Sequence, residues 1–407
     1  MENCKLITEC LACGHTELIP TLDFGLQPLA NNFRSSAMIA CEHQYPLAIN
    51  RCGHCNHLQL THAVDPAIIY THYLYVSGTS QTNRDYMQWF SGFVREQFGH
   101  WATSVLDIGC NDGTQLDFLK AAHFQTYGVD PAENLYPLSS KNHTIVCGFW
   151  DEDSAGKLGR DFDAIIAQNS FAHNPEPLPW LMLAKDYLKH DGKIFIQTSQ
   201  ADMVINDEFD TIYHEHISFY NARSMQLLAE RAGLYLIDVV KPPIHGTSYI
   251  FVLAKQPANE YRVANILAVE ESLGLQSAET YTRWAAGVDD LLKRLLDQIT
   301  EYQGFGYRVI GYGAAAKGMT LLNASKIQLD AVVDDNVLKQ GLYCPGTTIP
   351  VVSSEYIAQI PADDIVVFIP LAWNFYSEIV KRIRSVRSRD TDMFVRYFPR
   401  LTTLFYE

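Results

Sequence analysis

The sequence has no excess of positive charge. Its 407 residues contain 31 Lys and Arg against 46 Asp and Glu, which gives a formal net charge of −15 at pH 7. Proteins that bind DNA or RNA neutralise phosphates with clustered Lys and Arg. The composition therefore argues against a nucleic-acid partner, although it permits binding of a single nucleotide, which needs only one or two cations.

Long hydrophobic runs are lacking as well. No stretch of about 18 uncharged apolar residues occurs, and the N-terminal MENCKLITEC lacks the apolar core of a signal peptide. These absences predict a cytoplasmic protein without a membrane partner. The content of 47% hydrophobic and 19% charged residues is typical of folded domains, and the length predicts about two or three of them.

In a reducing compartment the nine cysteines do not predict a disulfide framework. Four of them form two C-x-x-C pairs, Cys10 with Cys13 and Cys52 with Cys55. Two such pairs supply the four thiolates of a closed tetrahedral zinc site, which leaves no position open for catalysis. The pattern therefore predicts a structural zinc, and the alternative is a set of unrelated buried thiols.

The order of apolar and glycine-rich stretches predicts an α/β protein with four segments. Residues 1–75 contain both cysteine pairs and predict a zinc-binding domain. In residues 76–255 apolar strands alternate with helices, which predicts a Rossmann-like, doubly wound parallel sheet. Residues 304–407 start a second strand–glycine–helix unit and predict a small C-terminal α/β domain. The linker at 256–303 predicts a helix with an apolar stripe of Trp284, Val288, Leu291, Leu295 and Ile299.

A glycine turn opens the central segment. In SVLDIGCNDG, Asp107 ends a strand, and Gly109 and Gly113 shape the turn into a helix. Asp130, about twenty residues further on, ends the next strand, where a carboxylate can accept both hydroxyls of a ribose. The spacing differs from G-x-G-x-x-G, and an acid before the turn suits the ammonium of S-adenosylmethionine. We predict a methyltransferase core with this cofactor, against an NAD-binding or empty Rossmann-like unit.

The segment FDTIYHEHISFY places Tyr213, His214, Glu215 and His216 in four consecutive positions. Two histidines around a glutamate can form a metal site, an acid–base centre or a hydrogen-bonded loop. A metal site at the histidines lacks further ligands at familiar spacing. In an extended strand the histidines face away from Tyr213 and Glu215. We therefore expect a loop, because only a loop lets Tyr213, Glu215 and His216 converge.

A series of uncommon motifs runs along the chain in a fixed order: LQPLANNF, the two cysteine pairs, YLYVSGTS, VLDIGCNDG, GVDPAEN, FDTIYHEHISFY, GYGAAAKGMTLLN, VVDDNVLKQGLYCPGTTIPV and AWN. In these motifs the chain resembles the S-adenosylmethionine-dependent sugar C-methyltransferases, which act on nucleotide-linked keto-deoxysugars. The resemblance covers essentially the whole chain. It implies a zinc domain, a methyltransferase domain and a C-terminal α/β domain that helps to hold the sugar nucleotide.

The resemblance also implies roles for individual residues. His216 would remove the proton beside the substrate ketone, since histidine is mostly neutral at cytoplasmic pH. Glu215 would orient this base or the substrate, and Tyr213 and His173 would donate to the developing oxygen. Either Tyr73 or Tyr75 would hydrogen-bond the sugar. The predicted cofactor site comprises Asp107, Gly109, Gly113, Asp130 and Asn169.

In the C-terminal segment, the turn GYGAAAKG offers backbone amides and Lys317 to an anion such as a nucleotide diphosphate. The alternative is that its three alanines only let the helix pack closely on its strand. Residues 245–250 are HGTSYI where the family has HGGSLR. A glutamine also stands after the fifth strand where an acid is common in the family. These two departures leave the identity of the sugar substrate open. The predicted substrate site comprises Lys317, Tyr312, His245 and Asn374.

Together these features predict methyl transfer from S-adenosylmethionine to a sugar carbon, at position 3 beside a 4-keto group, through an enolate. We expect the sugar to be linked to dTDP or GDP. The alternatives are an O- or N-methyltransferase of a small metabolite and a non-catalytic, zinc-containing binding protein. The second alternative predicts loss of the cofactor acids or of the base, yet Asp107, Asp130 and His216 are all present.

Overall fold

The structure is a computed structural model that describes residues 3–35, 42–98, 103–159, 161–198, 202–244 and 248–405. Contacts divide the chain into two units, each built from three stretches of sequence. The predicted segment boundaries stay a prediction, because contacts do not test independent folding. Unit 1 comprises Met1–Pro20, Ile49–Asp202 and Glu215–Ala278, and unit 2 comprises Thr21–Ala48, Met203–His214 and Glu279–Glu407.

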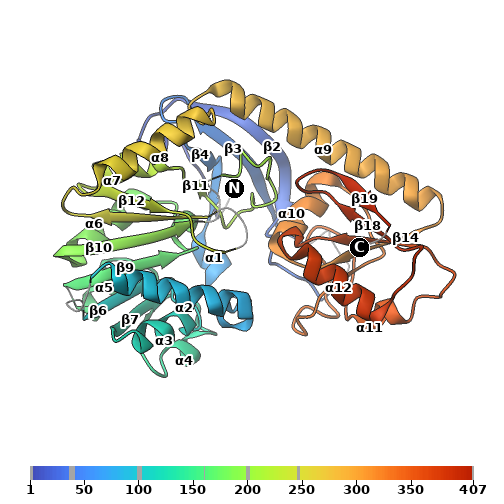
Figure 1. Cartoon of the computed structure of the whole chain (residues 1–407), viewed down its shortest axis with the longest axis horizontal. Helices are drawn as coiled ribbons and strands as arrows, with labels where there is room; N and C mark the ends of the chain where they lie inside the picture. The colour runs from blue at the N-terminus through green and yellow to red at the C-terminus, as the bar shows by residue number, and fades with distance from the viewer. Residues whose placement is uncertain are drawn as a thin grey trace. The chain divides into compact units, whose positions relative to one another are not determined.

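A seven-stranded sheet forms the centre of unit 1 (Figure 1). In spatial order its strands are β12 (Tyr235–Val240), β13 (Tyr249–Ala254), β10 (Leu188–Thr198), β9 (Phe162–Gln168), β6 (Ser104–Ile108), β7 (Gln125–Asp130) and β8 (Thr144–Cys147). The five strands from β10 to β8 are parallel, as the alternation of strands and helices predicted. β13 runs antiparallel to both β10 and β12, and the sequence did not predict this edge.

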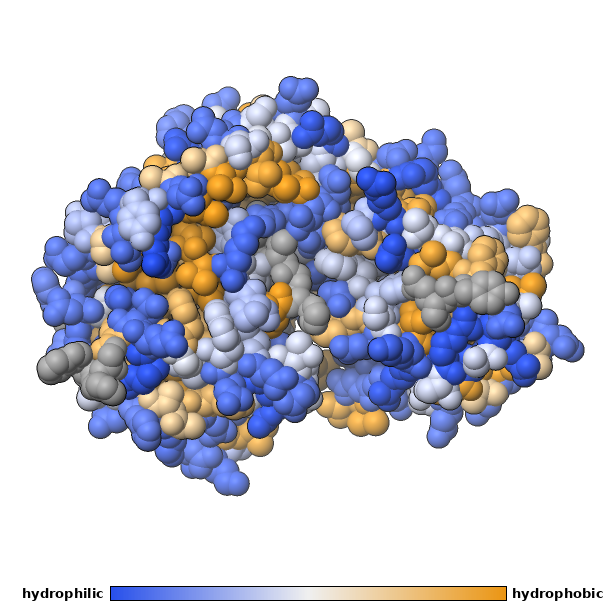
Figure 2. Space-filling view, viewed as in Figure 1, coloured by the Kyte–Doolittle hydropathy of each residue, from blue (hydrophilic) through white to orange (hydrophobic). Residues whose placement is uncertain are grey.

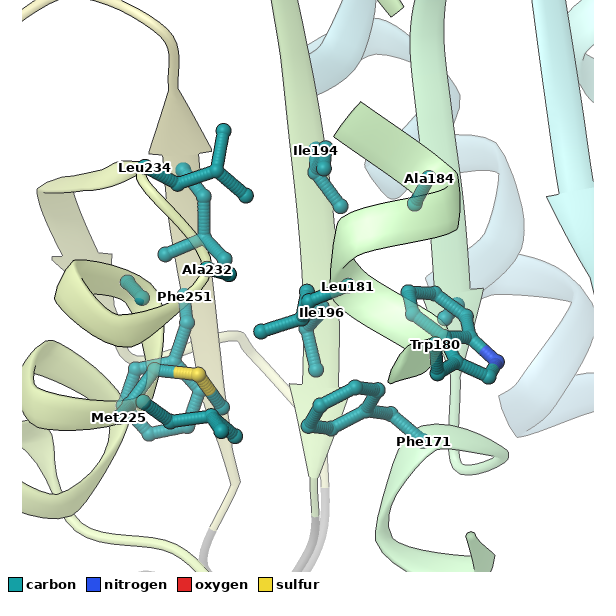
Figure 3. Close-up of a cluster of buried hydrophobic side chains, with 14 of the residues drawn as sticks. Phe171, Trp180, Leu181, Ala184, Ile194, Ile196, Met225, Ala232, Leu234 and Phe251 are labelled. Carbon is teal, nitrogen blue, oxygen red and sulfur yellow. The ribbon is translucent and has the colours of Figure 1, made fainter. Parts of the chain in front are cut away.

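Helices cover both faces of this sheet. They include α6 (Pro177–Tyr187) and α7 (Ala222–Arg231) on one face, and α2 (Gln81–Glu96) and α3 (Thr114–Ala121) on the other. In β9, Ile165 and Ala167 join the apolar cluster of α6 and α7, whereas Ala164 and Ile166 join that of α2 and α3. Figure 3 shows the first cluster. Burial on both faces explains why these strands are continuously apolar.

The cysteine-containing part of unit 1 is built from short strands. β1 (Cys4–Leu6) pairs with β5 (His62–Val64), and β4 (Leu58–Leu60) pairs with both β3 (Gln44–Cys52) and β11 (Ser218–Phe219). β2 (Leu18–Pro28) completes the second sheet, in the order β11–β4–β3–β2. β2 and β3 each continue from one unit into the other.

Unit 2 contains the predicted second α/β sheet. In spatial order its strands are β16 (Val351–Val352), β15 (Ala331–Val333), β14 (Arg308–Tyr312), β17 (Val366–Pro370), β18 (Met393–Arg396) and β19 (Thr402–Leu404). All neighbours are parallel except β18 and β19. α10 (Ala316–Ser325) follows the glycine turn after β14, and α12 (Tyr376–Val386) follows β17.

The predicted linker helix is α9 (Ala278–Gly304), whose buried stripe is Trp284, Val288, Leu292, Leu295 and Ile299. Leu291 was predicted in this stripe, but the buried leucine is Leu292. A spacing of four residues from Val288 keeps Leu292 on the stripe, since one helical turn takes 3.6 residues.

Short elements complete the described part of the chain: α1 (Pro66–Tyr70), η1 (Ser77–Thr79), α4 (Tyr136–Ser139), α5 (Glu152–Leu158), η2 (Phe171–His173), α8 (Glu260–Ser272), α11 (Glu355–Ala358) and η3 (Trp373–Phe375). Within the described ranges, no helix combines the length and apolar character that a membrane span needs. Hydrophilic side chains predominate on the face shown in Figure 2.

Candidate functional site

The four cysteines of the two C-x-x-C pairs converge in unit 1. Their sulfur atoms all lie within 4.8 Å of one another, and the Cys10–Cys55 and Cys13–Cys52 sulfur pairs are both 3.6 Å apart. Zn–S bonds of about 2.3 Å in a tetrahedron place sulfurs roughly 3.8 Å apart. The backbone amides of Cys13 and His54 also donate to the sulfurs of Cys10 and Cys52, each over 3.4 Å. The predicted zinc site is confirmed by this geometry.

The electrostatics of the cluster favour a bound cation. Contact with Cys52 raises the pKa of the Cys10 thiol to about 12, and contact with Cys10 and Cys52 raises the pKa of Cys55, whereas contact with Cys10 and Cys55 lowers the pKa of Cys52. Four thiolates in contact therefore require a divalent ion to balance their charge. Three of these cysteines belong to the apolar cluster of α7, and Arg231 of that helix donates to the Ala12 carbonyl at 2.8 Å. Zinc bound in this position would hold the N-terminal part of unit 1 on its core.

The glycine turn after β6 has the backbone that the sequence predicted. Gly109 and Gly113 have φ of 88° and 82°, which residues with a Cβ rarely adopt. A Cβ on Gly109 would also clash with Ser170. Asp107, at the end of β6, is buried, and this burial raises the pKa of its carboxyl to about 8, with the charge of Asp130 adding to the shift.

Asp130 ends β7, the neighbour of β6 in the sheet. Its carboxylate accepts backbone N–H groups from Asn111 at 2.8 Å and Ala132 at 2.9 Å. Two carboxylate oxygens have more acceptor capacity than these bonds use. Asn169 directly follows β9 on the other side of β6, and its side chain is exposed. Asp107, Asp130 and Asn169 therefore lie at the carboxyl ends of adjacent parallel strands, where α/β sheets bind ligands.

The YLYVSGTS segment is hydrogen-bonded to the same turn. The amides of Ser77 and Gly78 donate to the side chains of Asn111 and Asp112, at 2.9 and 3.1 Å. The Asn111 amide group donates in return to the Tyr75 carbonyl at 3.1 Å. Sequence reasoning missed Asn111 and Asp112 as positioning residues. The signal was the pair of polar residues inside CNDG, between the two turn glycines.

Residues 213–216 form a bend and a turn ahead of β11, which confirms the expected loop. Glu215 and His216 belong to unit 1 and are 4% and 6% exposed. Oε2 of Glu215 accepts a hydrogen bond from the Tyr73 hydroxyl at 2.7 Å. The Tyr70 hydroxyl donates to the Glu215 carbonyl at 3.2 Å. Of the two predicted sugar-contacting tyrosines, Tyr73 is therefore the one that the structure brings to this glutamate.

His173, in η2 after β9, stacks between two rings. Its ring centroid lies 5.1 Å from that of His216 and 5.5 Å from that of Tyr70. Burial lowers the pKa of His173 to about 4, so the ring is neutral at pH 7. Its Nε2 atom is buried and has no hydrogen-bond partner among the described residues. A buried polar atom without a partner is costly, and a bound ligand can supply one.

His214 and Tyr213 belong to unit 2. Nε2 of His214 donates to the Tyr45 carbonyl at 3.2 Å, and burial lowers the pKa of this histidine to about 4. Among the described residues, the four cysteines are the only group of three or more His, Cys, Asp or Glu side chains placed to hold a metal. The structure thus gives no support to a metal at His214 and His216.

The predicted substrate residues of unit 2 lie on different elements and have different contacts. The Tyr312 hydroxyl donates to Asp335 at 3.2 Å, and Asn374 lies in η3. Lys317 begins the first turn of α10, with its Nζ 3.9 Å from Asp210 Oδ1. In the turn before it, the Ala314 amide donates to Asp334 at 2.6 Å, so this amide is occupied by a carboxylate. His245, the remaining predicted residue, lies outside the described residues.

Comparisons with known proteins match most of the chain. The chain matches a zinc-binding domain family over residues 10–70, a methyltransferase domain family over 78–239 and a family described as C-methyltransferase C-terminal domain over 243–399. The C-methyltransferase NovU of Streptomyces niveus is 31% identical over 387 residues, which cover 92% of this chain and 91% of that protein.

Other similarities are confined to part of the chain. A ubiquinone biosynthesis O-methyltransferase of Coxiella burnetii (strain Dugway 5J108-111) is 24% identical over 186 residues, or 42% of this chain and 79% of that protein. The match to the solved PH0226 protein of Pyrococcus horikoshii OT3 covers 45% of this chain and 95% of that protein, with 18% identity and a TM-score of 0.36. The match to NovU, by contrast, extends through all three family regions. The chain therefore belongs to the S-adenosylmethionine-dependent sugar C-methyltransferases.

Proposed function

We propose that this C-methyltransferase methylates carbon 3 of a nucleotide-linked 4-keto-deoxysugar, with dTDP or GDP as the carrier. The observation that carries the proposal is the buried Nε2 of His173, which has no hydrogen-bond partner in the described ranges, beside the stacked ring of His216. His216 would act as the proton acceptor, and the neutral His173 beside it would act as the hydrogen-bonding group. This pair suits removal of a proton beside a ketone. O- or N-methylation has less need of a base, because the acceptor already has a lone pair.

Unit 1 has the groups to bind the methyl donor. Bound S-adenosylmethionine supplies an electrophilic methyl group on a positively charged sulfur. In the proposed complex, Asp107 places negative charge near the ammonium, and Asp130 accepts hydrogen bonds from the ribose hydroxyls. Gly109 and Gly113 let the backbone approach the ligand closely, and Asn169 completes the site. Burial raises the pKa of both carboxyls, and a cationic ligand beside them would lower these pKa values and favour the ionised forms.

The proposed reaction begins when the imidazole of His216 takes a proton from carbon 3. The electron pair of that C–H bond forms a double bond between carbons 3 and 4. The electron pair of the carbonyl group moves onto its oxygen, which gives an enolate. His173 donates a hydrogen bond to this oxygen, and Glu215, itself held by Tyr73, orients the base or a sugar hydroxyl. Tyr213 is retained as a predicted donor. Attack of the enolate carbon on the methyl group would break the bond between sulfur and the methyl carbon, whose electron pair stays on sulfur as S-adenosylhomocysteine, and would restore the ketone.

Unit 2 is proposed to hold the nucleotide part of the substrate. The Lys317 side chain is 24% exposed and offers one positive charge to a diphosphate. Tyr312 and Asn374 follow the ends of β14 and β17, where parallel sheets bind ligands. His245 is retained as a predicted contact. A diphosphate requires only such a local cation, in accord with the overall negative charge of the chain.

The proposal is tested with a panel of dTDP- and GDP-linked 4-keto sugars and methyl-labelled S-adenosylmethionine. We expect mass spectrometry to detect one transferred methyl group with at least one member of the panel. Carbon NMR of the labelled product should show that the new methyl group is bonded to a ring carbon. Label on oxygen or nitrogen, or methylation of a small phenol or amine and of no sugar, would contradict the proposal.

A further inference from the structure

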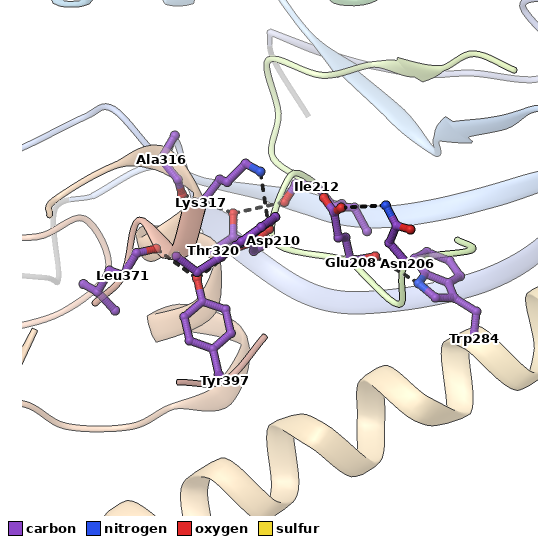
Figure 4. Close-up of polar contacts among 11 residues, drawn as sticks. Asn206, Glu208, Asp210, Ile212, Trp284, Ala316, Lys317, Thr320, Leu371 and Tyr397 are labelled. Atoms are coloured by element: carbon purple, nitrogen blue, oxygen red, sulfur yellow. Dashed lines mark hydrogen bonds and ion pairs between the residues drawn. The ribbon is translucent and has the colours of Figure 1, made fainter. Parts of the chain in front are cut away.

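A buried acid lies just ahead of the Tyr213–His216 motif, and the proposed reaction does not use it. The Asp210 side chain is 2% exposed. Its Oδ2 accepts hydrogen bonds from the indole N–H of Trp373 at 2.7 Å and the hydroxyl of Tyr397 at 2.9 Å. Within the described part of the chain its Oδ1 has no hydrogen-bond partner, and it forms an ion pair with Lys317 at 3.9 Å (Figure 4). All of these residues belong to unit 2.

The hydrogen bonds of Asp210 do not balance its charge. The Tyr397 hydroxyl has one hydrogen, which it shares between Asp210 and the Leu371 carbonyl, each 2.9 Å away. Burial, with the charge of Asp210, raises the pKa of Tyr397 far above its usual range, so this residue stays a neutral donor. A buried carboxylate needs a cation as well as hydrogen bonds. Lys317 provides it.

Lys317 is also the cation that the proposed function assigns to the diphosphate. Its Nζ lies 4.8 Å from the ring centre of Trp373, the same residue that donates to Asp210. The ion pair of 3.9 Å is longer than a hydrogen bond, and the lysine side chain is partly exposed. A phosphate that approaches this ammonium must therefore compete with Asp210 for it.

The same helix holds the residues that lead into the motif. Thr320, one turn after Lys317 on α10, donates from its hydroxyl to the Ile212 carbonyl at 3.1 Å. α10 is thus joined to residues 209–213 at two points, Lys317 to Asp210 and Thr320 to Ile212 (Figure 4). Weakening the ion pair of Lys317 with Asp210 therefore removes one of these two joins. Tyr213 and the proposed base His216 follow directly in the sequence.

We propose that Asp210 is a positioning residue that competes with the substrate diphosphate for Lys317, so that anion binding loosens residues 209–213 ahead of the base. The proposal rests on the proposed function, which places a diphosphate at Lys317. Linkage fixes the sign of the effect: if the anion weakens the hold of Asp210 on Lys317, then Asp210 weakens binding of the anion. Removal of the charge of Asp210 therefore tightens anion binding at Lys317. It also removes the ion pair that joins residues 209–213 to α10.

The test uses inorganic pyrophosphate and the full-length protein. We expect Asp210→Asn to bind pyrophosphate about fivefold or more tightly than wild type by calorimetry, in the usual range of coupling between sites. Lys317→Gln should bind it far more weakly. Adding Asp210→Asn to Lys317→Gln should then change the affinity little, because the competition acts through Lys317. General damage to the fold would weaken binding instead of tightening it.

The matched control is Asp364→Asn, which removes one negative charge from the same unit. Asp364 pairs with Arg308 at 2.6 Å rather than with Lys317, so its variant should bind pyrophosphate as wild type does. Unchanged or weaker binding by Asp210→Asn, or equal tightening by the control, would overturn the inference and leave the proposed methylation standing. If wild type binds no pyrophosphate, the diphosphate role of Lys317 is also wrong.

A second measurement needs no Asp210 variant. In wild type, saturating pyrophosphate should speed amide hydrogen exchange in a peptide covering residues 209–213, and it should not do so in Lys317→Gln. Slower or unchanged exchange in wild type would refute the loosening. This measurement shows whether anion binding loosens residues 209–213 even if Asp210→Asn fails to fold.

Discussion

The hydroxyl of Tyr73 donates a hydrogen bond of 2.7 Å to Oε2 of Glu215, across 142 residues of sequence. The Tyr75 hydroxyl has a different partner and accepts from the side-chain amide of Asn83 at 2.7 Å. The two tyrosines are two positions apart and were equivalent in the sequence. The structure distinguishes them, because Tyr73 contacts the motif of the proposed base and Tyr75 contacts Asn83 of α2.

Tyr73→Phe removes this donor and keeps the ring. We expect kcat to fall about tenfold or more, because Glu215 loses a fixed orientation, while the affinity for S-adenosylmethionine stays the same. Tyr75→Phe is the matched control and should reduce kcat less. Steady-state kinetics with an accepted sugar nucleotide measure both effects. A larger loss in Tyr75→Phe would reverse the assignment.

His216→Ala should reduce turnover by about 100-fold or more, the range expected for loss of a general base. Both ligands should bind as before, because the change removes proton transfer rather than contacts with the methyl donor. His214→Ala is the matched control: it removes one hydrogen bond to Tyr45 and should lower stability more than turnover. An inactive His214→Ala with an active His216→Ala would show that the base is the other histidine.

Binding of S-adenosylmethionine should release a proton near neutral pH. Without ligand, burial and then Asp130 hold the pKa of Asp107 at about 8, so its carboxyl is protonated at pH 7. A cationic ligand favours the ionised form, and affinity should rise with pH up to about 8 and then level off. Calorimetry in buffers of different ionisation enthalpy measures the released proton, and Asp107→Asn should abolish it. Affinity independent of pH would contradict this assignment.

The same shift acts on the stability of the ligand-free protein. Between pH 3.8 and about 8 the folded state binds one proton more than the unfolded state at Asp107. The contribution of this residue to the free energy of unfolding therefore falls as the pH rises through that window. Denaturant unfolding of wild type and Asp107→Asn should show the difference, with the variant less sensitive to pH.

Metal analysis should find about one zinc per chain, as a single closed thiolate site requires. Cys52→Ser should lose the metal and reduce soluble yield, since binding of structural zinc contributes to folding. Cys147→Ser, which changes an exposed thiol outside the cluster, should retain both. A soluble Cys52→Ser protein with full zinc content would contradict the site.

Local patterns predicted the parts of the site that depend on local backbone. The glycine turn followed from Asp107, Gly109 and Gly113, because positive φ and an adjacent strand have clear sequence signals. The zinc cluster followed from the spacing within each cysteine pair. In contrast, the antiparallel position of β13 could not be predicted, because a strand buried on both faces is apolar whichever way its neighbour runs.

Contacts between distant residues also had no signal in the sequence. Asp210 bonds to Trp373 and Tyr397, which lie 163 and 187 residues away. Nothing in FDTIYHEHISFY indicates that its second residue is buried with partners from the C-terminal segment. The motif drew attention to Tyr213–His216 because its residue types suggest chemistry. The residues that fix its position are ordinary ones, and only their contacts reveal them.

Each unit is assembled from three stretches of sequence, so the chain changes unit five times, after Pro20, Ala48, Asp202, His214 and Ala278. No single cut yields either unit intact. A C-terminal fragment that begins at Glu279 lacks both the Thr21–Ala48 stretch and the Met203–His214 stretch that contains Asp210. A chimaera intended to exchange unit 2 between relatives must therefore transplant three stretches together. Asp210 and its partners Lys317, Trp373 and Tyr397 would have to come from the same parent protein.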